Sequence, residues 1–199
     1  MGTGSSQSTR ARLPFLESLH VVLLGLDFSG KTTILYRLKL DEFINAVPTI
    51  GFNTEKVNAR AGRTKGVRFK FWDAGGSEKL RPLWKSYTRA TDAIVFVVDS
   101  SDQERFEEAK SELMKLGRSS QNSGVPILVI ANKQDLREAV SLEEVERHLN
   151  LSDLRLHNPY QLIPACGITG EGLVHVLDIL CEMINKRRSL ARQQKKRGR

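Results

Sequence analysis

At 199 residues with 40% hydrophobic content, the chain is long enough for one domain with a buried core. No apolar run reaches the length of a membrane span, no charged-then-apolar leader indicates secretion, and the two cysteines show no disulfide or metal spacing. The net charge of +8 lies near the C-terminus, where residues 186–199 carry eight cations and no acid. These features favour a cytoplasmic protein with a basic end.

Strands and helices are expected to alternate along residues 19–185, between a flexible, partly amphipathic segment 1–18 and a polybasic tail 186–199. Hydrophobic patterns and turn residues predict strands 20–24, 53–59, 67–72, 93–98, 127–131 and 160–164, and helices 31–40, 102–117, 141–149 and 171–186. Such alternation predicts an α/β fold with a mostly parallel six-stranded sheet, helices on both faces and one antiparallel hairpin. Ligands of such sheets bind at the carboxyl ends of the strands.

The first motif is a phosphate-binding loop, GLDFSGKT at residues 25–32, directly after an apolar strand. Its glycines let the backbone pass close to phosphate oxygens, and the loop N–H groups and the following helix N-terminus bind the anion. Lys31 is expected near the β- and γ-phosphates, and the Thr32 hydroxyl on Mg²⁺. The nucleotide contacts expected here are Asp27, Phe28, Ser29, Gly30, Lys31, Thr32 and Thr33.

A second motif, Asn132-Lys133-Gln134-Asp135, follows the apolar strand 127–131 and indicates which base is bound. Guanine presents two adjacent donors that the Asp135 carboxylate can accept, and adenine does not. Asp135 therefore selects guanine and penalises adenine. The Lys133 stem is expected to lie over the base, and Asn132 to tie this loop to the phosphate loop.

Two further segments are expected to sense the γ-phosphate. In Trp72-Asp73-Ala74-Gly75-Gly76, Asp73 is placed to hold Mg²⁺ through water, and the Gly76 N–H to contact the γ-phosphate. In Pro48-Thr49-Ile50-Gly51-Phe52-Asn53, the Thr49 hydroxyl is placed to complete the Mg²⁺ shell. Loops that are ordered by GTP and released after hydrolysis form a molecular switch.

These four motifs, with LRPLW after WDAGG, resemble the Arf and Arf-like small GTPases over residues 19–185, and most closely the fourth subfamily of ADP-ribosylation-factor-like proteins. The resemblance implies a P-loop GTPase domain that binds GTP and GDP with Mg²⁺ and acts in signalling and vesicle trafficking. It implies that Cys166 and Gly167 form the last base-binding loop, with the Gly167 N–H on the guanine oxygen. It also implies that the aromatic residues Phe52, Trp72 and Tyr87 contact effectors, although interior packing is the alternative.

Two positions and one segment bear on how closely the family mechanism applies. The family normally has Gln after the two glycines, where it orients the attacking water, whereas this chain has Ser77, whose hydroxyl is too short. Slow hydrolysis is therefore expected, and the alternative is a GTP-loaded binding platform that essentially does not hydrolyse. Asp27 is interpreted as an ordinary loop position. Residues 59–66 lengthen a hairpin that shifts register on GTP binding in the family.

The two ends of the chain suggest membrane attachment. Residues 1–6 fit M-G-x-x-x-[ST], so Gly2 is a candidate for myristoylation. One acyl chain binds membranes only marginally, with a constant of about 10⁴ M⁻¹, and the basic tail would supply the second signal on an anionic membrane. The alternatives for the tail are a two-cluster nuclear import signal read by importin, and a solubilising, disordered segment.

The resemblance also sets the expected partners and location. It implies a guanine nucleotide exchange factor, a GTPase-activating protein and effector proteins, with cytohesin-type exchange factors among the effectors. The expected location is the cytoplasmic side of the plasma membrane or an endomembrane, with the nucleus as a second site. No direct nucleic-acid role is expected, and the base motif argues against an ATP-dependent kinase built on the same phosphate loop.

Overall fold

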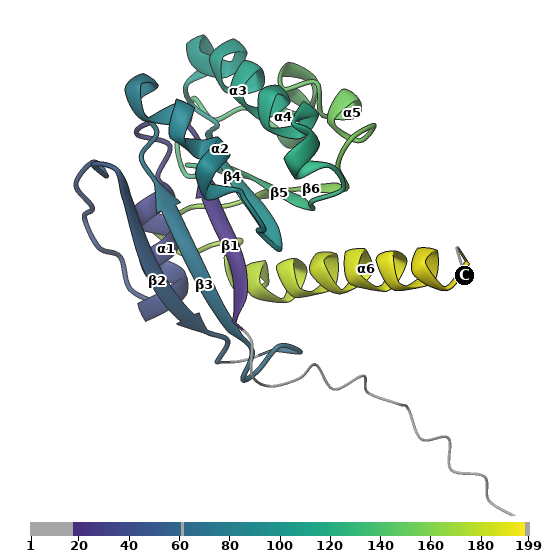
Figure 1. Ribbon diagram of the computed structural model, residues 1–199. Coiled ribbons are helices and arrows are strands. Elements are labelled where there is room, and N and C mark those ends of the chain that lie inside the picture. Colours follow the sequence, from purple (N-terminus) through teal and green to yellow (C-terminus); the bar gives the residue numbers. More distant parts are fainter. Residues whose placement is uncertain (1–17, 61, 198–199) are drawn as a thin grey trace, which may run out of the picture.

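The computed structural model describes residues 18–60 and 62–197 and contains a six-stranded sheet of order β2-β3-β1-β4-β5-β6 (Figure 1). Only the β2–β3 pair is antiparallel, and every other neighbouring pair is parallel. The predicted α/β fold with one antiparallel hairpin is therefore confirmed. The strands are β1 (Leu19–Leu24), β2 (Phe52–Asn58), β3 (Arg68–Ala74), β4 (Ala93–Asp99), β5 (Ile127–Asn132) and β6 (Tyr160–Pro164).

Helices cover both faces of the sheet (Figure 1). They are α1 (Lys31–Leu40), α2 (Trp84–Tyr87), α3 (Phe106–Arg118), α4 (Leu142–His148), α5 (Leu151–Leu154) and α6 (Val176–Arg197), with 3₁₀ turns η1 (Glu78–Leu83), η2 (Gln103–Arg105) and η3 (Ser120–Asn122). Because side chains alternate along a strand, each central strand serves two cores. In β1, Val22 packs in the core with α3, α4 and α5, whereas Val21 packs in the core with α1 and α6.

Helix α6 differs most from expectation, because it begins at Val176 rather than residue 171 and ends at Arg197 rather than 186. Its late start follows from Gly172, which has φ +77° and whose added Cβ would lie 2.1 Å from the Pro164 carbonyl oxygen. That conformation belongs to a turn. The helix continues because the next residues are mainly Lys, Arg, Gln, Leu and Ala, which favour helices, without Gly or Pro.

The remaining predictions concern the shorter helices and the N-terminal segment. Helix α4 lies within the predicted range 141–149 and begins with a capping box, in which the Ser141 side chain and Glu144 exchange hydrogen bonds with each other's backbone N–H. Helices α2 and α5 and the turn η1 were not predicted. Gly2 and most of the expected N-terminal segment lie outside the described residues. Within residues 18–60 and 62–197, no helix combines the length and the apolar character needed to cross a membrane.

Candidate nucleotide-binding site

A cleft of about 700 Å³ opens beside the loops that follow β1, β3, β5 and β6. It brings together most of the residues predicted from the sequence, because parallel strands end at the same edge of the sheet. The predicted residues that line it are Asp27, Phe28, Gly30, Lys31, Thr32, Thr33, Thr49, Gly76, Ser77, Asn132, Lys133, Asp135 and Gly167. Ser29, Asp73 and Cys166 are buried and are not part of this lining.

The phosphate loop is folded so tightly that two of its positions require glycine. Gly25 has φ +141°, and an added Cβ would lie 2.2 Å from the Val97 carbonyl oxygen of β4. Gly30, with φ +90°, precedes α1, and its Cβ would lie 2.3 Å from Asn132 Nδ2. Both residues therefore allow close packing and a backbone conformation that other residues rarely adopt. The first residues of α1, Lys31, Thr32 and Thr33, line the cleft, so the N-terminus of this helix is available as an anion site.

Lys31 is the buried cation of the cleft. Its Nζ donates a hydrogen bond to the Leu26 carbonyl oxygen at 2.7 Å. Burial lowers the pKa of Lys31 to about 8, and the nearby carboxylates of Asp73 and Asp27 oppose that effect. A phosphate in the cleft would add negative charge next to this ammonium group and favour its protonated form.

Three oxygen-bearing side chains converge beside Lys31 in a geometry that suits a hard cation. The Thr32 hydroxyl donates to Asp73 Oδ2 at 2.6 Å and lies 3.0 Å from the Thr49 hydroxyl oxygen. Burial raises the pKa of Asp73, whereas the hydrogen bond from Thr32 lowers it. Asp73 Oδ1 is buried and has no hydrogen-bond partner among the described residues. Mg²⁺ takes hydroxyl, carboxylate and water oxygens, so this donor set fits the metal.

The loops that would hold the base are joined through Asn132. Its Nδ2 donates to the Ser29 carbonyl oxygen at 2.8 Å, which confirms the expected link to the phosphate loop. Its Oδ1 accepts the Gly167 N–H at 2.9 Å. Contact of that N–H with guanine stays a prediction. Lys133 has φ +65° and pairs with the Asp99 carboxylate, and Asp135 is exposed at the cleft.

The segment after β3 lies directly against the phosphate loop. A Cβ added at Gly76 would lie 2.3 Å from the Asp27 nitrogen and 2.3 Å from the Leu26 carbonyl carbon, so only glycine fits. The Gly75 N–H donates to the Gly51 carbonyl oxygen at 2.8 Å, which joins this segment to the one before β2. Ser77 lines the cleft and is half-buried.

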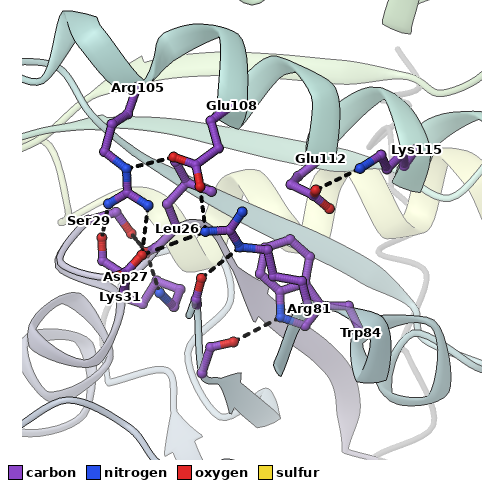
Figure 2. Close-up of polar contacts among 12 residues, drawn as sticks. Leu26, Asp27, Ser29, Lys31, Arg81, Trp84, Arg105, Glu108, Glu112 and Lys115 are labelled. Atoms are coloured by element: carbon purple, nitrogen blue, oxygen red, sulfur yellow. Dashed lines mark hydrogen bonds and ion pairs between the residues drawn. The ribbon is translucent and has the colours of Figure 1, made fainter. Parts of the chain in front are cut away.

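Sequence reasoning missed two parts of the site. Apolar side chains line the cleft beyond the motifs, among them Phe43, Val47, Ile50, Leu136 and Ile168. Leu136 and Ile168 directly follow the predicted base loops in the sequence, and this adjacency could have identified them as residues that line the cleft. The second part is the partner of Asp27, because the Arg105 guanidinium donates to its carboxylate at 2.7 Å (Figure 2).

The three aromatic residues suggested for effector contact lie together, outside the cleft lining. The ring of Phe52 stacks on Trp72 with centroids 5.0 Å apart and lies 5.3 Å from the ring of Tyr87. Phe52 is 48% exposed, and the other two are partly buried. Trp84 is buried, and its indole N–H donates to the Gly75 carbonyl oxygen at 3.0 Å.

Comparisons with known proteins agree with this geometry. Residues 8–184 match the model of the ADP-ribosylation factor family. The chain is 57% identical over 199 residues to "ADP-ribosylation factor-like protein 4A" of Homo sapiens, covering 99% of this chain and 100% of that protein. It is 57% identical over 181 residues to human "ADP-ribosylation factor-like protein 4C", covering 91% and 94%.

A solved structure also matches. The Arl6 BBS3 small GTPase from Trypanosoma brucei, with the bound nucleotide analogue GppNp, superposes with a TM-score of 0.76 at 34% sequence identity. The match covers 86% of this chain and 99% of that chain. The likeness therefore extends from the sequence motifs to the whole arrangement of strands and helices.

Proposed function

This chain belongs to the ADP-ribosylation factor family, in the Arf-like subfamily 4, and on that premise we propose that it is a membrane-recruited switch with slow GTP hydrolysis. Membership makes it a small GTPase and a GTP-binding switch. The observation that supports slow hydrolysis is Ser77, which lines the cleft directly after Gly75 and Gly76.

Nucleotide recognition uses the groups described above. The loop N–H groups and Lys31 bind the phosphates, and Asp135 accepts the two guanine donors. Thr32 and Thr49 would hold Mg²⁺ directly and Asp73 through water, and the metal neutralises phosphate charge when it is bound. The Gly76 N–H contacts the γ-phosphate, so GTP and GDP are distinguished by this segment. The GTP state presents the Phe52, Trp72 and Tyr87 surface to effectors, with cytohesin-type exchange factors among them.

Hydrolysis is slow because no side chain at position 77 reaches the attacking water. In phosphoryl transfer, positioning and electrostatic stabilisation supply most of the rate enhancement. A serine hydroxyl is two bonds from the backbone Cα, whereas a glutamine amide extends well beyond it. A second candidate function follows from the same residue, namely a platform that stays GTP-loaded and is controlled by an exchange factor and by abundance.

Measured hydrolysis decides between these two. The nucleotide released from purified protein identifies the ligand, and single-turnover hydrolysis of bound GTP gives the intrinsic rate. We expect Ser77→Gln to raise that rate and Ser77→Ala to leave it unchanged. Loss of hydrolysis in Ser77→Ala would contradict the proposal, because the serine would then be a working group. No measurable hydrolysis in the native protein would favour the platform.

Membrane recruitment is proposed to need both an acyl chain on Gly2 and the cations near the C-terminus. Helix α6 carries exposed Lys186, Arg192, Lys195 and Lys196, and its C-terminal part extends away from the sheet (Figure 1). Each cation near an anionic leaflet contributes up to about 1 kcal/mol. The proposed location is the cytoplasmic face of the plasma membrane or an endomembrane. Entry into the nucleus through importin is the alternative use of the same cations.

Liposome binding tests this step with protein acylated during expression. Gly2→Ala and neutralisation of Lys195, Lys196 and Arg197 should each reduce association with anionic vesicles. The part of vesicle binding that depends on these cations should become smaller at high salt, because salt screens surface charge. Undiminished binding of the combined variant would show that neither end is the anchor.

A further inference from the structure

A group of ion pairs connects the phosphate loop, η1 and the start of α3 (Figure 2). Arg81 of η1 has a side chain that is only 7% exposed, and its Nη2 lies 2.7 Å from Glu108 Oε1 and 3.7 Å from Asp27 Oδ1. Arg105 pairs with the same two carboxylates, at 2.7 Å from Asp27 Oδ1 and 2.7 Å from Glu108 Oε2. We call these four residues, Asp27, Arg81, Arg105 and Glu108, the charged quartet.

The quartet balances the charge of a buried guanidinium group. A buried cation is costly unless carboxylates and hydrogen bonds satisfy it. Arg81 is satisfied by Glu108, by Asp27 and by the Gly76 carbonyl oxygen, to which its Nε donates at 2.8 Å. Hydrogen bonds from Arg105 and then from Arg81 lower the pKa of Glu108 to about 2, so this carboxylate is ionised at neutral pH.

Arg81 of the quartet and its neighbour Trp84 fix the orientation of two successive peptide groups next to the phosphate loop. Trp84 donates to the Gly75 carbonyl oxygen at 3.0 Å, and Arg81 donates to the Gly76 carbonyl oxygen at 2.8 Å. A peptide group is planar, and its N–H points opposite to its carbonyl. Holding the Gly75 oxygen therefore sets the direction of the Gly76 N–H. Holding the Gly76 oxygen prevents the next peptide group, between Gly76 and Ser77, from rotating away.

We propose that Arg81 is a positioning residue for γ-phosphate recognition, with Glu108 and Asp27 as the carboxylates that keep its guanidinium group in place. This inference rests on the proposed contact between the Gly76 N–H and the γ-phosphate. Asp27 belongs to the loop that binds the phosphates, and Gly76 lies against that loop. The quartet thus joins the loop that binds every nucleotide to the segment that distinguishes GTP from GDP.

Positioning of the Gly76 N–H and ordinary stabilisation of the fold have different effects on GDP binding. GDP has no γ-phosphate, so its affinity does not depend on where the Gly76 N–H points. If the quartet positions that N–H, weakening the quartet shortens the lifetime of the GTP complex and leaves the GDP complex nearly unchanged. If the quartet only stabilises the fold, both complexes weaken together with the unfolding temperature.

The test measures dissociation of a fluorescent GDP and of a fluorescent non-hydrolysable GTP analogue in Mg²⁺. Arg81→Lys keeps the charge but loses the planar donor group, and Glu108→Gln removes one counter-ion without shortening the side chain. Glu112→Gln is the matched control, because Glu112 lies one turn further along α3 and pairs with Lys115 at 2.8 Å, away from Arg81 (Figure 2).

We expect the two quartet variants to speed release of the GTP analogue about tenfold, as loss of a charge-assisted hydrogen bond predicts. Release of GDP should stay within about twofold, and the Glu112→Gln control should change neither rate, because its ion pair is with Lys115 and includes neither Arg81 nor Gly76. Equal acceleration for both nucleotides, or no acceleration, would overturn the inference. If Arg81→Lys does not fold, Glu108→Gln alone decides, because Glu108 is partly exposed and tolerates an isosteric change.

A Gly76→Ala variant tells failure of the inference from failure of the proposed function. Its Cβ would lie 2.3 Å from the phosphate loop, so the segment must move and the GTP preference should fall. If Gly76→Ala keeps the native GTP-to-GDP preference, the γ-phosphate contact is wrong and the inference falls with it. If Gly76→Ala loses the preference while Arg81→Lys and Glu108→Gln keep it, only the role of the quartet is overturned.

Discussion

Replacing Gly167 with alanine should stabilise the protein, although this glycine lies in the nucleotide cleft. Its φ lies outside the left-handed region that other residues avoid. An added Cβ would lie 3.4 Å from Ile34 Cγ1, 3.4 Å from Thr33 Cγ2 and 3.6 Å from Asn132 Oδ1. These are close but ordinary van der Waals contacts. The position therefore accepts a methyl group without a change of backbone.

The size of the effect follows from two contributions. Alanine restricts the unfolded chain relative to glycine, which is worth about 0.4–1 kcal/mol where the native backbone suits it. Burying one methyl group contributes up to about 0.8 kcal/mol. The close contacts with Ile34 and Thr33 subtract part of this, so a net gain of about 1 kcal/mol is expected. For a chain of this size, that gain raises the unfolding temperature by about 2–4 °C.

Thermal unfolding at one fixed, saturating concentration of GDP and Mg²⁺ measures the gain, because bound ligand also shifts the midpoint. Gly172→Ala is the opposite control. Gly172 has φ +77°, and its Cβ would lie 2.1 Å from the Pro164 carbonyl oxygen, so this variant should unfold at a lower temperature. A lower unfolding temperature for Gly167→Ala would refute the reasoning, and would mean that the cleft uses the backbone freedom of glycine at this position.

Three further results are expected. Asp135→Asn should weaken guanine binding and admit xanthine nucleotides in competition assays, because the amide offers a donor where the carboxylate accepted; unchanged discrimination would contradict the base assignment. Asp178→Asn should cost about 1 kcal/mol in chemical unfolding, since Asp178 accepts the Thr64 hydroxyl at 2.6 Å and the Thr64 N–H at 3.0 Å in a partly exposed setting. The folded state lowers the pKa of Glu108 from 4.5 to about 2, so the ionised carboxylate stabilises the folded protein fully above pH 4.5, and this contribution is lost as the pH falls towards about 2. Glu108→Gln should therefore weaken the dependence of the free energy of unfolding on pH between these two values.

The strands were predictable because their signal is local. The apolar runs at β1, β4 and β5 are buried on both faces, as parallel strands covered by helices must be. Helix α4 was predictable because its capping box lies within four residues of sequence. The turn η1 was not, because it contains Pro82, and its conformation is set by contacts such as that between Arg81 and Gly76.

The cleft residues were predictable where they belong to local sequence motifs and lie near strands that end at the same edge of the sheet. Lys31 and Thr32 follow the loop after β1, and Asn132 is the last residue of β5. The carboxyl ends of these parallel strands lie at one edge of the sheet, so the convergence of the three residues follows from topology. The pairing of Asp27 with Arg105 does not, because those residues are 78 positions apart and no local pattern links them. A carboxylate in a phosphate loop looks misplaced in sequence, and only the fold shows the guanidinium group beside it.

Recognition and hydrolysis of GTP depend on different parts of the same segment in this proposal. The proposed contact to the γ-phosphate is the backbone N–H of Gly76, and the peptide groups before and after this residue are held by Trp84 and Arg81 through the Gly75 and Gly76 carbonyl oxygens. Neither hydrogen bond involves the side chain at position 77. Replacing the family glutamine with Ser77 therefore removes the group that orients water and leaves the recognition geometry intact. A switch built in this way holds GTP normally and turns off slowly.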